Sequence, residues 1–543
     1  MVFARRSTTL LAAIIASCAM VLSLTACTSD NKTVVDGQTT VTSNSAGGVA
    51  VFTPSDGITL NQQMPLNKWA KLVPDLTKAL VDAGFKKGDI NHTTSDSLDK
   101  QSRAIQDFVV DHLSNNTTDD SGIAIAPDNM TLLVAPVVEA DASTRQYGDY
   151  VSQNLSTNDV TDEGATSDGE SSEGDSSKDD SSNTESDSTA SDEQAQAVDR
   201  LVSSLKLAKE SGMHVVLLGN SIEGYKPDAF VKFSDAQTIG KLQAEKMVSK
   251  LKLDKASKDN PKYIEVLLPY TAMDEKGNAN DSTFAQEAFR GIWQVLGSYY
   301  QKGVVESPSG TLDGKSTEND WQAVAYDAAK EGSTAKVLDK RLAKTDGQST
   351  LTRIDGIITM NDYIASEVVK ELDDLGYTGS AADINPQITI SGIVGNITGK
   401  KDLSRDAVPD PIKSPENDNA NDSSSSDDDA DKDTSASDKD RDSQWPLVTG
   451  YGAYVSNIPS IVNGKQWMTG MEDRQTIATD IAQACAKLNK DEALNSMPSI
   501  RNSEVGGVKK IPTISEPLLA VSASNLKSAL IDPGYISLAD AGL

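Results

Sequence analysis

The chain has 543 residues, enough for two or three domains, and a formal net charge of −30. Two stretches rich in Ser and Asp hold two-thirds of that charge: residues 151–195 contain 13 acidic and one basic residue, and residues 414–443 contain 11 acidic and three basic residues. The rest of the chain is therefore only mildly acidic. This charge balance disfavours nucleic acids and anionic lipid headgroups as partners.

The first 27 residues have the layout of an export signal. Arg5 and Arg6 precede an apolar run, Thr8–Leu24, that is shorter than the roughly 20 residues a membrane-spanning helix needs. The following Thr25-Ala26-Cys27 completes a stretch that resembles the lipobox of bacterial lipoproteins, in which the cysteine is lipidated. An ordinary signal peptide with an incidental cysteine is the alternative. Residues 28–47, rich in Ser, Thr, Asn and Gly, are predicted to be a flexible tether.

Cysteine and histidine are scarce. With Cys18 removed in the signal and Cys27 lipidated, Cys485 is the one thiol left, so no intrachain disulfide is expected. The three histidines show no HExxH spacing, and the chain has no CxxC. The sequence therefore predicts no metal site and no cofactor.

The first elements alternate between strand and helix. The apolar run 48–53 predicts a buried strand, and residues 131–135 predict another. A helix is expected over residues 97–113. Apolar residues at helical spacing ahead of Gly84 predict an earlier helix with a C-terminal glycine; they are Trp69, Leu72, Leu76 and Leu80.

The two acidic stretches are predicted to be disordered, because their composition cannot bury enough apolar surface to offset the chain entropy lost on ordering. Residues 151–195 interrupt one αβ unit and do not separate two domains. A calcium-binding loop is disfavoured because no DxDxDG spacing occurs. We interpret both stretches as solvated spacers on loops, which keep the surface of the folded protein at a distance from a charged cell wall.

Helices and strands keep alternating downstream. Predicted helices begin near Ala197, Ser234, Thr283, Trp321 (to Ala329), Asn361, Ser456 and Gln475, and predicted strands cover 215–218, 263–268, 303–307, 356–360, 388–394, 446–450, 511–515 and 518–521. Strands alternating with helices of this length indicate βαβ units on parallel sheets. Because so many units would overfill one sheet, we expect two α/β lobes, each a parallel sheet flanked by helices.

Several segments, taken in order, resemble the type I periplasmic sugar-binding proteins, the ribose- and xylose-type receptors of ABC importers. The segments are Lys232–Asp235, Ile358–Ala365 leading to Leu375-Gly376, Asn463–Thr469 with Glu472–Arg474, and Ile531–Tyr535. The resemblance extends from Gly48 to Leu543 apart from the two acidic stretches. It implies a two-lobed fold with a ligand cleft between the lobes and a hinge that closes over the ligand.

The resemblance also implies domain boundaries. The N-terminal lobe covers residues 48–233 and the C-terminal lobe covers 234–473. Residues 474–513 return to the first lobe with a helix, and residues 514–543 close the chain across the hinge.

Candidate ligand-binding residues follow from the same resemblance, position by position. Asn361 matches a hydroxyl-binding asparagine, although Asn is also a good helix N-cap. Trp321 and Trp69 match aromatic residues of the cleft, and a place in the hydrophobic core is the alternative for both. Phe284 and Tyr451 are further candidates.

Three polar positions depart from the family pattern. Gly219-Asn220 stands where relatives carry Asp-Arg, Gly452 where they carry Asp, and Glu472 where they carry Gln or Lys. Asn220 and Glu472 remain candidate ligand contacts. The departures favour a different ligand or weak sugar binding.

Together these features predict a monomeric, lipid-anchored solute-binding protein on the extracytoplasmic face of a bacterial membrane, which binds a sugar and delivers it to an ABC permease. A sensory receptor without a transport role and a surface protein whose binding fold has lost its ligand are the alternatives. An enzyme is disfavoured, because the chain has no nucleophile elbow, no His-based triad spacing and no P-loop.

Overall fold

The structure is a computed structural model, and Ser45–Leu543 form one compact unit in it. It describes residues 46–55, 65–115, 125–138, 145–150, 153–156, 185–273, 280–328, 330–343, 351–381 and 445–543. The predicted signal, Cys27, the strand predicted at 388–394 and the acidic stretch 414–443 lie outside the described residues.

The first sheet has seven strands in the order β15-β16-β7-β5-β3-β1-β2. All neighbouring strands are parallel except β15 and β16, which are antiparallel. The strands are β1 (Gly48–Pro54), β2 (Ile90–Ser95), β3 (Met130–Val134), β5 (His214–Leu218), β7 (Ala229–Lys232), β15 (Ile500–Val505) and β16 (Val508–Ser515).

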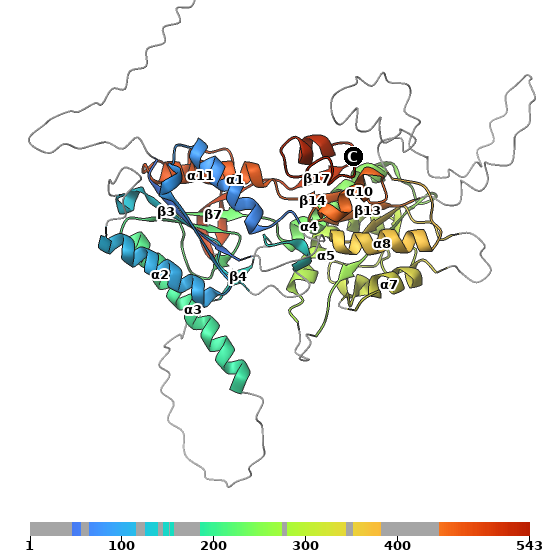
Figure 1. Ribbon diagram of the computed structural model, residues 1–543. Helices are drawn as coiled ribbons and strands as arrows, with labels where there is room; N and C mark the ends of the chain where they lie inside the picture. The colour runs from blue at the N-terminus through green and yellow to red at the C-terminus, as the bar shows by residue number, and fades with distance from the viewer. Residues whose placement is uncertain are drawn as a thin grey trace, which may run out of the picture. The chain divides into compact units, whose positions relative to one another are not determined.

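Helices cover both faces of this sheet, because its inner strands are apolar on both faces. Along β1, Val49 and Val51 pack on one face, with helices α1 and α11, and Ala50 and Phe52 pack on the other, with α2 and α3. Figure 1 shows α2 and α3 side by side on one face and α1 and α11 on the opposite face. The helices are α1 (Trp69–Asp82), α2 (Leu98–Asn115), α3 (Glu185–Glu210) and α11 (Arg474–Leu488).

The second sheet has six strands in the order β10-β8-β12-β13-β14-β17, parallel except for the pair β14 and β17. The strands are β8 (Lys262–Val266), β10 (Val305–Glu306), β12 (Gly356–Ile358), β13 (Leu447–Tyr451), β14 (Met468–Met471) and β17 (Leu519–Ser522). Short parallel pairs flank the two sheets: β4 (Asn154–Leu155) with β6 (Ser221–Ile222), and β9 (Leu268–Pro269) with β11 (Ala325–Tyr326).

The second sheet is also covered on both faces. Ile358 packs with α4 and α5, and its neighbour Ile357 packs on the other face with α7 and α8. These helices are α4 (Ala236–Leu251), α5 (Thr283–Gln301), α7 (Ser333–Arg341) and α8 (Asp362–Asp374), and two short ones, α6 (Trp321–Val324) and α10 (Ile458–Val462), lie on connections. The predicted fold class, two mainly parallel sheets flanked by helices, is thus confirmed.

The described chain passes between the two sheets three times. It crosses from β7 to α4 near Ser234, from β14 to α11 near Glu472, and from β16 to β17 near Glu516. After β17, the C-terminal residues pack with α10 in a small core of their own, which includes Leu526, Leu530 and Tyr535.

Two predicted details are wrong. The stretch 151–195 is not disordered throughout: β4 lies in it, and α3 begins at Glu185, because Ala, Glu and Gln favour helix and acidic residues stabilise a helix N-terminus. The helix predicted from Trp321 to Ala329 ends at Val324, because Ala325–Tyr326 pairs with β9. The returning segment 474–513 begins with the expected helix, which ends at Leu488, and then supplies two strands to the first sheet.

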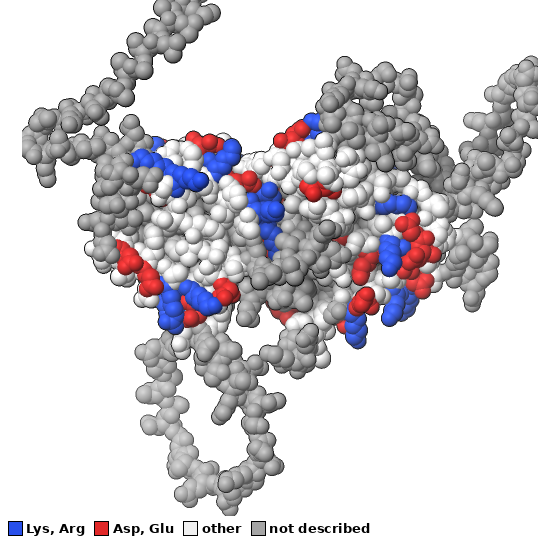
Figure 2. All heavy atoms as spheres, in the orientation of Figure 1, with Lys and Arg blue, Asp and Glu red and all other residues white. Residues whose placement is uncertain are grey.

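Charged side chains of both signs are interspersed on the face drawn in Figure 2. No helix among the described residues is long and apolar enough to cross a membrane.

Candidate ligand site at the carboxyl ends of the two sheets

Most of the predicted site residues lie where strands end. Asn220 follows β5, Asn361 follows β12, Tyr451 ends β13 and Glu472 follows β14. In open α/β sheets, ligands bind outside the carboxyl ends of the strands. The six-residue segment Arg145–Tyr150, which we call the strap, also lies here, and its residues Tyr147 and Tyr150 belong to the hydrophobic cores of the second and the first sheet.

Asn361 serves as a helix cap and also contacts the strap. Its Oδ1 accepts a hydrogen bond from the backbone N–H of Ile364 at 2.9 Å, which caps α8. Its Nδ2 donates to Oε1 of Gln146 in the strap at 3.0 Å. The Asn361 side chain is fully buried, so both halves of its amide are used within the protein.

Phe284 and Tyr451 pack around another strap residue, Tyr147. The Tyr147 ring lies 4.7 Å from Phe284 and 6.4 Å from Tyr451, measured between ring centroids. Tyr147 is only 1% exposed and belongs to the hydrophobic core of the second sheet. The strap therefore inserts an aromatic ring between two residues predicted to bind ligand.

Trp69 lies in the core of the first sheet and also holds the strap. Its ring contacts Tyr150 and Phe233 edge to face, with centroids 5.0 and 5.7 Å away. Its backbone N–H, at the start of α1, donates to Oδ2 of Asp149 at 3.1 Å. The side chain is 2% exposed.

Asn220 and Gly452 are fixed by local structure. Asn220 Oδ1 accepts from the N–H of Gln153, and its Nδ2 donates to the carbonyl of Pro136, both at 2.9 Å. Gly452 has φ +113°, and a Cβ there would lie 2.9 Å from the Tyr454 ring. The backbone thus requires glycine at a position where the sequence resemblance implies aspartate.

Glu472 bridges two of the crossings between the sheets. Its Oε1 accepts from the backbone N–H of Ser234 at 2.5 Å, and the Ser234 hydroxyl lies 2.5 Å from the Tyr451 hydroxyl. Burial raises the pKa of Glu472 to about 7, although the hydrogen bonds from Ser234 and Tyr451 lower it. Glu472 is 1% exposed, and its carboxyl group is bonded to a residue of another crossing, Ser234.

A second buried carboxylate, Asp362, lies beside Asn361, and the sequence did not single it out. Its Oδ2 accepts from the N–H of Tyr454 and the hydroxyl of Thr469, both at 2.9 Å, and its Oδ1 accepts from Nε2 of Gln466 at 2.7 Å. Burial raises the pKa of Asp362 to about 6. The network holds the loop after β13, whose Tyr454 hydroxyl donates to the strap carbonyl of Gln146 at 2.7 Å.

Trp321 has a different neighbour. It packs edge to face on Tyr270, with centroids 5.1 Å apart, and is 9% exposed in the core of the second sheet. The guanidinium of Arg341 holds the end of α6 by donating to the carbonyl of Val324 at 2.9 Å. The structure thus brings Asn361, Phe284, Tyr451 and Trp69 to the strap, whereas Asn220, Glu472 and Trp321 have other partners.

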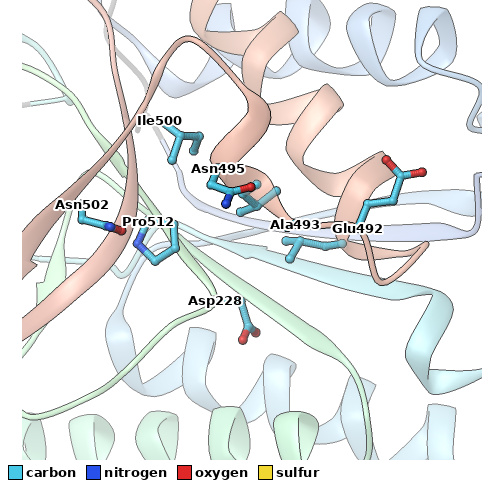
Figure 3. A pocket seen from close by; sticks show the side chains of 9 residues that line it. Asp228, Glu492, Ala493, Asn495, Ile500, Asn502 and Pro512 are labelled. Carbon is cyan, nitrogen blue, oxygen red and sulfur yellow. The ribbon is translucent and has the colours of Figure 1, made fainter.

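A cavity of about 430 Å³ lies elsewhere, near the amino end of β7. Figure 3 shows Asp228 on one side of it and Glu492, Ala493 and Asn495 on the other. None of the predicted site residues lines it. Among the residues that the structure describes, no group of three or more His, Cys, Asp and Glu side chains could hold a metal ion.

No protein-family model matches the chain, and no curated protein matches it in sequence. Solved structures align with most of it. An ABC transporter solute-binding protein from Clostridium phytofermentans with bound β-D-glucose is 17% identical with a TM-score of 0.44, and the alignment covers 91% of this chain and 99% of that one. A carbohydrate transporter solute-binding protein from Chloroflexus aurantiacus in complex with D-glucose is 18% identical with a TM-score of 0.43, covering 92% and 98%.

A periplasmic ribose ABC transporter protein from Conexibacter woesei is 12% identical with a TM-score of 0.42, covering 90% of this chain and 96% of that one. These proteins are of the class that the sequence segments resemble.

Proposed function

We propose that this protein is an extracytoplasmic solute-binding protein, anchored by lipid on Cys27, that captures a sugar between two lobes and delivers it to an ABC importer. The lobes correspond to the two sheets, with boundaries at the crossings near Ser234 and Glu472. One observation carries the proposal: Asn361, Phe284 and Tyr451 converge on one place at the carboxyl ends of two sheets that the chain joins three times.

The chemistry of that place suits a sugar. Aromatic rings such as Phe284 and Tyr451 offer flat apolar faces to the C–H surface of a pyranose, and the Asn361 amide offers a donor to a hydroxyl. Binding has only to stabilise a closed arrangement of the lobes relative to an open one. Glu472, which ties two crossings together, lies where such a movement would bend the chain.

The test is a binding screen of the chain from Thr28 onward, which contains the whole compact unit. The probes are D-glucose, ribose, arabinose and D-allose, the sugars named for the similar structures. A sugar at a hundred times its Kd should add about 2.7 kcal/mol to the free energy of unfolding and raise the melting temperature.

A matched pair of variants ties any such shift to the site. Phe284→Leu removes a ring that packs on Tyr147, whereas Phe108→Leu removes a similarly half-buried ring on α2 that packs on Phe52. Loss of sugar binding in the first variant alone supports the proposal. A melting temperature that no probe changes would contradict it.

The lipid anchor has its own test. Cys27→Ala should abolish incorporation of labelled palmitate and release the protein from the membrane fraction, because stable anchoring needs acyl chains. Cys18→Ala is the control, since that residue lies within the predicted signal and should change neither result. Equal labelling of both variants would contradict lipidation at Cys27.

One observation favours a second candidate, a surface protein whose binding fold no longer takes a free ligand. The polar site candidates Asn220, Asn361 and Glu472 are all at least 97% buried and bonded within the protein. The binding screen distinguishes the two candidates: a sugar that raises the melting temperature supports the first, and no change with any probe supports the second.

A further inference from the structure

The C-terminal half of the strap is fixed to the residues just ahead of α1, a helix that covers the first sheet. The N–H of Asp149 donates to the carbonyl of Asn67 at 2.8 Å, and Asp149 Oδ1 pairs with Lys68 Nζ at 2.7 Å. The Tyr150 hydroxyl donates to the carbonyl of Lys68 at 2.5 Å. There is no space for a side chain at Gly148 between the strap and this segment: Gly148 has φ +96°, and its Cβ would lie 2.6 Å from the Asn67 carbonyl oxygen.

The N-terminal half of the strap reaches the second sheet. Gln146 accepts two hydrogen bonds from that side, at Oε1 from Asn361 and at its carbonyl from Tyr454. Tyr147 is buried against Phe284 and Tyr451. One short segment thus packs into the cores of both sheets at the place where the ligand site is proposed.

The strap occupies groups that a sugar would use. The amide oxygen of Gln146 accepts from the Asn361 amide, as a hydroxyl oxygen would, and the Tyr147 ring, tilted by 52°, packs on the Phe284 ring, which could otherwise contact a pyranose. A sugar and the strap cannot use the same donor and the same ring face together. If the strap only formed a wall of the site, the Asn361 amide and the Tyr147 ring would line an open cavity. Instead, both residues are at least 99% buried.

We infer that Gln146 and Tyr147 are specificity-determining residues that occupy the ligand position, so that a sugar binds only by displacing them. The position of the strap follows from the contacts described above, whereas the statement that it excludes a sugar rests on the proposed function. When the binding-competent state is only a fraction of the population, the apparent Kd rises by the inverse of that fraction. A strap seated 90–99% of the time would therefore weaken binding by about 10- to 100-fold.

The first measurement is calorimetric titration of the chain from Thr28 onward with the four probe sugars. Tyr147→Ala and Gln146→Ala remove the two groups that occupy the site, and Tyr147→Phe keeps the ring as a matched control. We expect the alanine variants to bind at least one probe about tenfold more tightly than the unchanged protein, and the phenylalanine variant to bind like it. Weaker or equal binding by Tyr147→Ala would overturn the inference, because the ring would then be a wall of the site or irrelevant to it.

The second measurement needs no sugar and therefore separates this inference from the proposed function. In hydrogen exchange without ligand, the N–H of Asp149 should be protected in the unchanged protein and should exchange at least about tenfold faster in the Gln146→Ala/Tyr147→Ala double variant. Unprotected exchange in the unchanged protein would overturn the placement of the strap. If the N–H of Asp149 is protected but no variant binds a sugar, the placement of the strap is upheld. The same result would contradict the proposed function and overturn the claim that the strap keeps sugars out.

Discussion

The carboxyl ends of the two sheets and the amino end of the first sheet are built in opposite ways. At the carboxyl ends, the strap fills the space, and the polar side chains Asn361 and Glu472 are buried and bonded. At the amino end of β7, a cavity of about 430 Å³ is lined by exposed groups such as Asn495 and Glu492 (Figure 3). The difference teaches that a cavity in this fold need not lie where the predicted site residues come together.

The contrast extends to the carboxylates at the two places. Asp362, at the carboxyl end, is fully buried and accepts three side-chain or backbone hydrogen bonds. Asp228, at the amino end, keeps a side chain that is 25% exposed, accepts from the N–H of Val215 at 2.8 Å and pairs with Lys209 at 2.8 Å. Removing a buried acceptor leaves its donors without a hydrogen bond, whereas water can bond to the donors of a partly exposed acceptor that is removed.

The largest effect is therefore expected from Asp362→Ala, with Asp228→Ala as its counterpart. Three donors lose their acceptor in the first variant, which should lower the free energy of unfolding by about 3–5 kcal/mol. The second should cost about 1 kcal/mol. Urea denaturation measures both, and similar losses at the two positions would contradict the contrast between the ends.

A pH dependence should come from Glu472. Its pKa is about 7 in the folded protein because of burial, against about 4.5 for an ordinary glutamate. Between these two pH values the folded state retains a proton that the unfolded state has lost, so the free energy of unfolding falls as pH rises. At about 1.4 kcal/mol per pKa unit, the loss over this whole interval is roughly 3–4 kcal/mol.

The measurement compares urea denaturation at pH 5 and pH 8. Glu472→Gln keeps an oxygen to accept from Ser234 but cannot ionise, so its stability should change less between the two pH values. Asp362, with a pKa of about 6, contributes a decrease of the same sign in both proteins and cancels in the comparison. An unchanged pH dependence in Glu472→Gln would show that this carboxyl group is not the source.

Local patterns allowed much of the fold to be predicted. Leu72, Leu76 and Leu80 form the buried stripe of α1, and the positive φ of Gly84 and Gly376 agrees with the predicted helix ends. By contrast, β2 and β15 were missed. Both are edge strands with mostly exposed polar residues, so neither the apolar run of a buried strand nor a clear alternation marks them.

The site was less predictable, because its contacts join distant parts of the chain. Gln146 meets Asn361 across 215 positions, and no spacing in the sequence indicates that pairing. Two tyrosines around Gly148, just ahead of the acidic stretch, were the one available signal for the strap. For Asn361 the local pattern favoured both a cap and a ligand contact, and the cap is the part confirmed by the structure.

The smallest effects separate the two roles of Asn361. Ser caps a helix about as well as Asn, so Asn361→Ser should lose the donor to Gln146 but keep the cap, whereas Asn361→Ala loses both. In urea denaturation we expect Asn361→Ala to cost about 1–2 kcal/mol and Asn361→Ser about 1 kcal/mol less. Asn495→Ala, at the exposed amino end, should stay within about 0.5 kcal/mol. Equal losses in the Ser and Ala variants would mean that the contact with the strap, and not the cap, is what Asn361 contributes to stability, and the carboxyl end would then depend on the strap for its fold.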